Sequence, residues 1–276
     1  MSSEDWRALN RANWDERVRV HLEPGGYDLT ALREGRDRLG PIEEAELGPV
    51  TGLRVLHLQC HFGRDTLILC QRGAEVVGLD FSAPAITVAR RLAEELGLER
   101  RARFVEADLY DAVAAIAEPQ VFDLVFVTWG AIYWLPDIRR WAEIVAHFLK
   151  PGGALYLAEG HPAALVFDDE RPLPDGLPGY YLPYFQREPL VYDNATDYMN
   201  PTARLQNSRQ VSWMHPLATT VTALLDAGLR LDWLHEHDAA AWQMFRTLVE
   251  GPDGLFRWPD KRWLPLSFSL HATRTP

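Results

Sequence analysis

Several features are scarce in this chain of 276 residues, and each scarcity argues against a class of protein. The two cysteines, Cys60 and Cys70, cannot build a disulfide framework, so we expect a reducing, cytoplasmic setting. No run of about 18 apolar residues occurs, which argues against a membrane-spanning helix. Basic residues number 28 against 39 acidic ones, and the formal net charge of −11 argues against binding to nucleic acid or an anionic membrane. The polar, acidic first residues lack the basic and apolar regions of a signal peptide.

Tryptophan is plentiful but unevenly placed. Ten tryptophans are present, yet none lies between Trp14 and Trp129. That interval instead contains short aliphatic runs that alternate with amphipathic stretches, a pattern typical of βαβ units around a parallel sheet. The length and an apolar fraction of 47% fit one globular domain, residues 1–276, with an insertion.

The alternation predicts seven strands, at residues 53–58, 75–79, 103–106, 122–128, 154–159, 230–235 and 266–272. Helix signals separate them. Ser82 is a plausible N-cap with Pro84 in the first turn, and Gly97 ends that helix. Further helices are expected from Asp137 onward and at residues 216–227, and residues 1–50 read as helical.

The regular pattern stops after residue 161. Eight of the 19 prolines fall between Pro162 and Pro216, together with many tyrosines. Because a structureless loop of this length is uncommon inside a compact domain, we predict an insertion with short strands near residues 180–186 and 204–213.

Three successive strand ends carry polar groups suited to a nucleoside. The turn after the first strand exposes backbone N–H groups and contains Gly63. Asp80 ends the second strand, 21 residues after Gln59, where a carboxylate can accept hydrogen bonds from ribose hydroxyls. Asp108 follows the third strand, where a carboxylate can accept from the exocyclic amine of a purine. The sequence therefore predicts a nucleoside-shaped ligand across the sheet edge.

These segments resemble the motifs of class I S-adenosylmethionine-dependent methyltransferases. The first motif reads His-Leu-Gln-Cys-His-Phe-Gly at residues 57–63, and further matches lie at 78–82, 106–109, 122–127 and 149–155. The resemblance covers about residues 50–160 and resumes at about 216–235 and 264–273. It implies a Rossmann-like, doubly wound α/β sheet of seven mostly parallel strands with an antiparallel last strand. The implied segments are an N-terminal helical cover (1–50), a cofactor-binding core (51–161), an inserted substrate lid (162–214) and the completion of the core sheet (215–276).

The first motif departs from the family pattern. An acidic residue is usual where His57 stands, and glycines are usual where Gln59 and His61 stand. The contact to the methionine amino group must then come from elsewhere, and Gln59 or a backbone carbonyl is the expected substitute. This variant, with segments 159–162 and 213–216, resembles a bacterial subgroup of small-molecule methyltransferases.

The resemblance implies S-adenosylmethionine as cofactor, S-adenosylhomocysteine as product, and a set of site residues. The N-terminal helices are expected to fold over the cofactor with Trp14. The implied cofactor-binding residues are His57, Gln59, Gly63, Asp65, Asp80, Phe81, Ser82, Asp108, Leu109, Thr128 and Tyr27. The implied acceptor-binding residues are Trp129, Tyr133, Trp134, Tyr181 and Tyr184.

The implied reaction is in-line methyl transfer to an oxygen or nitrogen nucleophile of a small molecule. Since the sulfonium is already a good leaving group, the protein mainly supplies proximity and alignment. A base is needed only where the acceptor must lose a proton, and Glu159, His161 and His215 are the alternatives. Residues 161–200 contain seven acidic residues against two arginines, which favours a neutral or cationic acceptor. A pocket lined by Arg187, Arg204 and Arg209 would favour an anion instead.

Other functions stay open. An NAD-dependent oxidoreductase would need a Gly-x-Gly-x-x-Gly turn, which is absent, and would not require Asp108. A non-catalytic adenosyl-ligand-binding module would share the fold, and an RNA methyltransferase conflicts with the acidic charge. His57, Cys60, His61 and Cys70 have zinc-ligand side chains, but a turn that must face a cofactor predicts no metal. We expect a monomer or homodimer.

Overall fold

The computed structural model describes residues 3–276, with side chains described from Trp6 onward. Its centre is a seven-stranded sheet in which β14 runs antiparallel to both of its neighbours and the other strands are parallel to one another. This confirms the predicted fold class. In sheet order the strands are β10 (Leu229–His237), β14 (Ser267–Arg274), β5 (Leu149–Gly160), β4 (Phe122–Thr128), β1 (Arg54–Leu58), β2 (Glu75–Asp80) and β3 (Ala102–Glu106).

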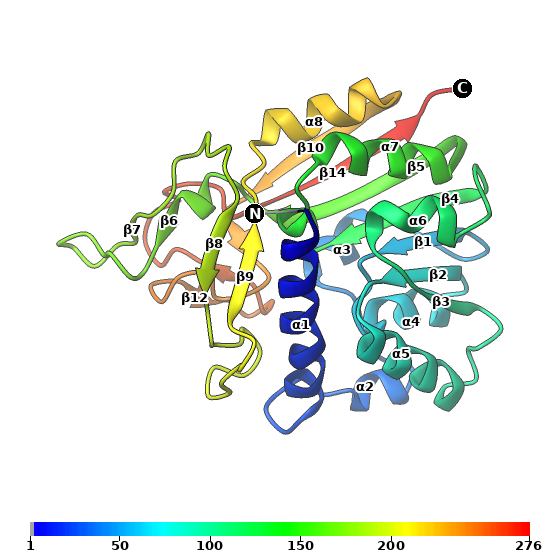
Figure 1. Cartoon of the computed structure of the whole chain (residues 1–276), viewed down its shortest axis with the longest axis horizontal. Coiled ribbons are helices and arrows are strands. Elements are labelled where there is room, and N and C mark those ends of the chain that lie inside the picture. Colours follow the sequence, from blue (N-terminus) through cyan, green and yellow to red (C-terminus); the bar gives the residue numbers. More distant parts are fainter. Residues whose placement is uncertain (1–2) are drawn as a thin grey trace.

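Helices cover both faces of the sheet because successive strand residues point to opposite sides. Leu56 and Leu58 of β1 pack into one apolar cluster, whereas Val55 packs into the other. Figure 1 shows α7 and α8 along one side and α4 and α5 along the other. The first side carries α6 (Ala112–Ala115), α7 (Ile138–Phe148) and α8 (Leu217–Asp226); the second carries α2 (Thr30–Arg33), α3 (Pro41–Glu46), α4 (Arg64–Gln71) and α5 (Ala83–Glu95).

The predicted helix signals act as expected. The Ser82 hydroxyl accepts a hydrogen bond from the Ala85 N–H at the start of α5. Asp137 accepts from the N–H groups of Arg139 and Arg140 at the start of α7. Gly97 follows α5 with φ +65°, which a glycine adopts without steric cost. These caps fix where α5 and α7 begin, and therefore where the loops at the carboxyl edge of the sheet end.

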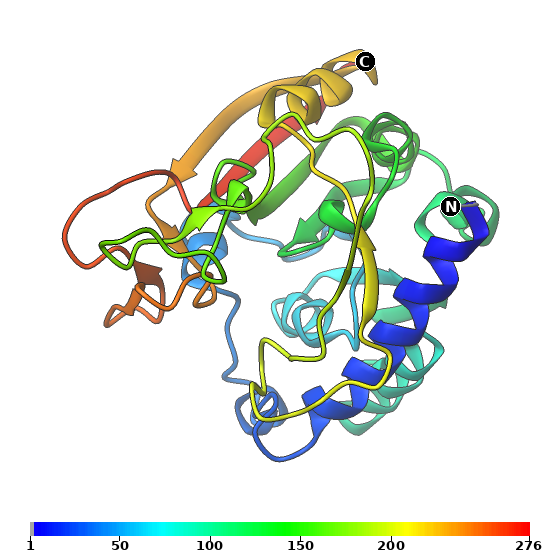
Figure 2. The same ribbon diagram turned by 60° about the vertical axis from the view of Figure 1, so that its left-hand side comes forward.

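Helix α1 (Ser3–Leu22) stands beside the carboxyl edge of the sheet, next to β9 (Arg209–Ser212) of the inserted lid, and both views place the two side by side (Figures 1 and 2). The side-chain amide of Asn10 donates to the Val211 carbonyl and accepts from the Val211 N–H, both at 2.8 Å. Because both groups are buried, α1 and the lid are joined by bonds that water cannot easily replace.

The inserted lid contains less strand than predicted. Of residues 180–186, only Tyr180 belongs to a strand, β7 (Gly179–Tyr180), which pairs with β6 (Phe167–Asp168). Pro183 and Pro189 lack the N–H groups that a longer strand would need. The second predicted strand shortens to β9, which pairs with β8 (Leu190–Asp193).

A small sheet that the sequence did not predict interrupts the run between β10 and β14. It consists of β11 (Ala239–Ala240), β13 (Phe256–Arg257) and β12 (Val249–Glu250) in that order. Strands of two residues are too short to show a period-two pattern. Three 3-10 turns complete the elements: η1 (Leu109–Asp111), η2 (Ile132–Trp134) and η3 (Ala164–Val166). Within residues 3–276, no helix has both the length and the apolar character that crossing a bilayer requires.

Candidate active site

The turn after β1 keeps a glycine-like backbone although two of its residues are not glycine. Gln59, His61 and Gly63 have φ values of +56°, +52° and +80°. Their backbone therefore turns as the family's glycine-rich motif would, at a cost of about 1 kcal/mol for each non-glycine residue. The His57 side chain is buried between β4 and α4: its ring packs against that of Phe126, its Nδ1 lies 2.8 Å from Thr66 Oγ1, and burial lowers its pKa to about 3. A neutral His57 in this position does not take the place of the usual carboxylate.

Gly63 is the position where a side chain would be costly. A Cβ atom there would lie 2.7 Å from Phe104 Cε1 and 3.1 Å from Ala89 Cβ. We expect Gly63→Ala to lower the free energy of unfolding by about 2 to 4 kcal/mol, because strain and overpacking add. The control is Gly97→Ala, at φ +65° with no atom within 4 Å, which should cost only about 1 kcal/mol. Urea unfolding measures both, and equal losses would contradict this account.

Two side-chain atoms on the turn are buried and have no hydrogen-bond partner. The Gln59 side chain donates from Nε2 to the Ala131 carbonyl at 2.8 Å, while its Oε1 is buried with no hydrogen-bond partner. The Nε2 atom of His61 is also buried without one. An unpartnered buried polar atom in a folded protein calls for a ligand or water.

Asp80 ties the turn to the start of α5. Its Oδ2 accepts from the His61 N–H at 2.8 Å and its Oδ1 from the Ser82 N–H at 2.9 Å. Burial raises the pKa of Asp80 to about 6, although these backbone bonds act in the opposite direction. After β3, the neighbouring strand, the Asp108 carboxylate accepts from the Tyr110 N–H at 2.9 Å, and burial raises the pKa of Asp108 as well. The two predicted carboxylates therefore sit at adjacent strand ends.

Three side chains of α1 contact predicted cofactor-binding residues. Arg7 lies 3.3 Å from Asp108, the Arg11 guanidinium lies 5.7 Å from the Phe81 ring, and Ser82 donates to Asp15 at 2.6 Å. Sequence reasoning missed these three α1 residues. Their spacing of four residues, which places them along one side of a helix, was the available signal.

Trp14 reaches from the first turn to the loop after β4. Its ring centroid lies 5.6 Å from that of His61 and 5.6 Å from that of Trp134, edge to face in both cases. Since these two loops flank the end of β1, the indole covers the space between them.

The three candidate bases are engaged in different ways. Glu159 accepts from four backbone N–H groups, those of residues 130, 131, 132 and 160, and burial raises its pKa against their effect. His161 accepts at Nδ1 from the Ala163 N–H, and its Nε2 lies 2.9 Å from Glu236. His215 donates from Nε2 to the Leu135 carbonyl at 2.8 Å. Glu159 thus holds the loop after β4, and His161 links β5 to β10.

The predicted acceptor residues do not all face one space. Trp129 turns away, donating from Nε1 to Glu43 at 2.7 Å, and the Tyr184 hydroxyl accepts from the Leu217 N–H. The rings of Tyr133 and Trp134 pack edge to face, with their centroids 5.8 Å apart. The structure therefore brings Tyr133 and Trp134 together and turns Trp129 and Tyr184 toward other partners.

The remaining predicted cofactor residues lie around the same edge. Leu109 is 4% exposed and belongs to the core, and Thr128 ends β4. Asp65 accepts from Arg64 at 2.9 Å in the first turn of α4. The Tyr27 hydroxyl lies 3.2 Å from that of Tyr198 in the lid.

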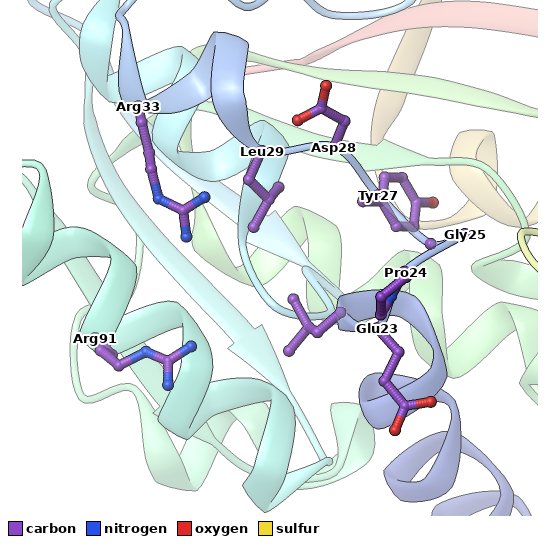
Figure 3. A pocket seen from close by; sticks show the side chains of 10 residues that line it. Glu23, Pro24, Gly25, Tyr27, Asp28, Leu29, Arg33 and Arg91 are labelled. Carbon is purple, nitrogen blue, oxygen red and sulfur yellow. The ribbon is translucent and has the colours of Figure 1, made fainter.

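Two cavities adjoin this region. One, of about 410 Å³, lies beside the loop after α1, bordered by Tyr27 and Leu29 and by Arg33 and Arg91 from α2 and α5 (Figure 3). The other, of about 300 Å³, is bordered by Trp6, Arg7, Tyr110, Pro136, Asp137 and Arg140. Arg7 connects the second cavity to Asp108. Among the described side chains, no group of three or more His, Cys, Asp or Glu residues could hold a metal ion.

Comparisons with known proteins agree with the fold. Residues 55–153 match the family model described as a methyltransferase domain. A solved S-adenosylmethionine-dependent methyltransferase from Mesorhizobium loti superposes with a TM-score of 0.59 at 24% identity, covering 85% of this chain and 96% of that one. The fold is that of an S-adenosylmethionine-dependent methyltransferase.

Two curated relatives match over half of the chain or less. A demethylmenaquinone methyltransferase from Thermus thermophilus is 38% identical over 137 residues, which are 49% of this chain and 55% of that protein. A tRNA 5-carboxymethoxyuridine methyltransferase from Escherichia coli is 30% identical over 113 residues, 41% of this chain and 42% of that protein. The chain spans about half the length of the curated relatives that it matches.

Proposed function

We propose that this protein is an S-adenosylmethionine-dependent methyltransferase that acts on an oxygen or nitrogen nucleophile of a small molecule. The observation that carries the proposal is the row formed by Asp80, Phe81 and Asp108 at adjacent strand ends, next to a turn with unpartnered inward-facing polar atoms. Asp80 would hold the ribose hydroxyls, Phe81 would lie against the adenine, and Asp108 would accept from its amine. The cofactor would then take the place of Arg7 at Asp108.

The chain's own part in the reaction is to bind, align and exclude water. When bound, S-adenosylmethionine supplies a methyl group on a sulfonium that is itself a good leaving group. Trp14 and Trp134 offer aromatic faces beside the first turn, which suits a sulfonium cation by about 1 kcal/mol or more when desolvated. Glu159 fixes the loop that carries Trp134 by accepting from three backbone N–H groups of that loop, so the acceptor side stays aligned.

A small, uncharged or cationic acceptor fits the charges of the lid better than a polyanion. The acidic chain and the name of the demethylmenaquinone relative both favour a small molecule, although a tRNA methyltransferase is also among the relatives. Of the three predicted bases we retain His215, because Glu159 and His161 have their accepting atoms in structural bonds. Burial lowers the pKa of His215, which keeps its imidazole neutral and able to take a proton from an alcohol or phenol.

Ligand-dependent stabilisation tests the proposal directly. S-adenosylhomocysteine at about one hundred times its dissociation constant should raise the free energy of unfolding by about 2.7 kcal/mol, because it binds only the native state. NAD at the same concentration should leave it unchanged, since the first turn lacks the dinucleotide-binding glycines. Thermal denaturation with each compound measures both. Stabilisation by NAD alone would favour the oxidoreductase reading and exclude this proposal.

A further inference from the structure

A buried glutamate on α3 contacts the loop after β4. Glu43 is 1% exposed, and its Oε1 accepts from the Trp129 indole N–H at 2.7 Å. Its Oε2 is also buried and has no hydrogen-bond partner among the residues that the structure describes. Since a glutamate is rarely buried without a paired charge, the contact with Trp129 calls for an explanation.

The backbone of Trp129 is unusual. Its φ is +41°, in the left-handed region that bulky residues rarely occupy, and Gly130 follows with φ +74°. The chain therefore turns sharply directly after β4. A strained residue of this kind persists only where surrounding contacts hold it, and such residues are concentrated at functional sites. The indole of Trp129 is held by Glu43 and by Trp242, whose ring centroid lies 6.1 Å away, edge to face.

The loop after β4 connects several parts of the candidate site. Glu159 accepts from three of its backbone N–H groups, and the Ala131 carbonyl accepts from Gln59 of the first turn at 2.8 Å. The same loop carries Trp134, which the proposed function places beside the sulfonium. Two buried carboxylates therefore hold this loop, Glu159 from β5 in its middle and Glu43 from α3 at its start.

We infer that Glu43 is a positioning residue, which acts through Trp129 to hold the loop after β4 in the geometry that the candidate site requires. The inference rests on the proposed function and adds to it a residue that precedes the first strand of the sheet. The neighbouring residue Ile42 belongs to an apolar cluster with Ala239 and Leu255, and Trp129 packs against this cluster. Because α3 is itself packed against the small sheet, it can act as a fixed support.

The Glu43 carboxyl group can accept from the indole in either protonation state, but its charge changes near neutral pH. Burial, and then the charge of Asp65 on α4, raise the pKa of Glu43 to about 7. Tyr156 of β5 also faces this group, and its hydroxyl donates to Glu46 at 2.9 Å. The indole N–H of Trp129 therefore meets a carboxylate at high pH and a neutral carboxyl group at low pH. Because a charged acceptor makes the stronger hydrogen bond, the change gives a spectroscopic signature.

Nuclear magnetic resonance of the full chain detects this signature. One indole N–H signal, assigned by its absence from Trp129→Phe, should move between about pH 6 and pH 8. The movement should disappear in Glu43→Gln, because the amide oxygen still accepts but does not titrate. Glu44→Gln is the matched control, since Glu44 lies next on α3 and pairs with Arg72 instead. If the signal does not move in the unchanged chain, or still moves in Glu43→Gln, the inference is overturned.

Calorimetric titration with S-adenosylhomocysteine tests whether the contact positions the site. Glu43→Leu removes the acceptor and Trp129→Phe removes the donor, so each should weaken binding by about tenfold. The double variant should lose no more than either single variant, because the two residues act through one contact. Glu43→Gln, which keeps the acceptor, should retain most of the affinity.

Gly40→Ala provides a second test, because Glu43→Leu also changes the core. Gly40 has φ −63°, which alanine adopts without strain, but a Cβ there would lie 2.6 Å from Glu43 Oε2. The variant displaces the carboxyl group without removing it and should weaken binding in the same direction. Additive losses in the double variant, or full affinity in all three altered chains, would overturn the inference and leave the methyltransferase proposal standing. If the unchanged chain does not bind S-adenosylhomocysteine, the proposed function fails and the positioning role fails with it.

Discussion

Replacing Asp80 with alanine is expected to abolish binding of S-adenosylhomocysteine. Loss of two charge-assisted hydrogen bonds to the ribose would weaken binding by roughly a hundredfold or more. The same carboxylate accepts from the N–H groups of His61 and Ser82, so its removal also leaves two backbone donors unpaired. We therefore expect the free energy of unfolding to fall by about 1 to 3 kcal/mol in addition.

Two further variants separate binding from folding. Asp80→Asn keeps one carbonyl oxygen for a backbone N–H and should lose less stability while still losing the ligand. The control is Glu106→Ala. Glu106 is the β3 residue that lies beside Asp80 in the sheet, and it is exposed. It should change neither stability nor affinity measurably. Unaltered affinity in Asp80→Ala would remove Asp80 from the proposed site.

The second large effect concerns the contact between α1 and the lid. Asp197 lies 2.7 Å from Arg17 and 3.0 Å from His21, and the three side chains are 0%, 6% and 0% exposed. Asp197→Asn leaves Arg17 buried without its counter-charge, which should lower the free energy of unfolding by about 3 to 5 kcal/mol. Urea unfolding at neutral pH measures the change. Asp193→Asn, an exposed lid position, is the control and should stay within about 0.5 kcal/mol.

The loss of stability in Asp197→Asn should depend on pH, because the Asp197 carboxylate titrates. Burial alone would raise the pKa of Asp197, but hydrogen bonding and charge from His21, with backbone N–H groups, lower it from 3.8 to about 2. A carboxylate whose pKa is lowered by folding stabilises the protein above its unfolded pKa and loses that contribution as pH falls through the folded value. The difference in stability between the unchanged chain and Asp197→Asn should therefore shrink between about pH 4 and pH 2. A constant difference across this range would contradict the ionic role.

The sheet was predictable because its signals are local. Aliphatic runs such as Phe122–Thr128 mark a strand directly, and Ser82 and Asp137 mark helix starts by hydrogen bonds to residues two or three positions away. The small sheet β11–β13 gave no such signal, since its strands are two residues long. Its residue Ala240 belongs to an apolar cluster with Ala164 and Leu266, which lie too far away in the sequence to form a local pattern.

Only the candidate site residues at the strand ends of the sheet were predictable from the sequence. Asp80 and Asp108 follow from the spacing of strand ends, and Gln59 follows from the family resemblance. The opposite side depends on contacts between positions far apart in the chain, such as His21 with Asp197 and Asn10 with Val211. An isolated reading of Glu159 as a base also failed to anticipate that the backbone of residues 130–132 would use its oxygens.

The docking of α1 has a consequence for the order in which the molecule assembles. This helix leaves the ribosome before the strands of the sheet, yet the partners of Arg17 and Asn10 lie 180 and 201 residues downstream. A nascent chain that ends before residue 197 holds the sheet's first five strands but none of the lid residues that pair with Asn10, Arg17 and His21. The helix that covers the sheet edge is therefore made before the sheet and docked late, and contacts of such long range slow the final folding step.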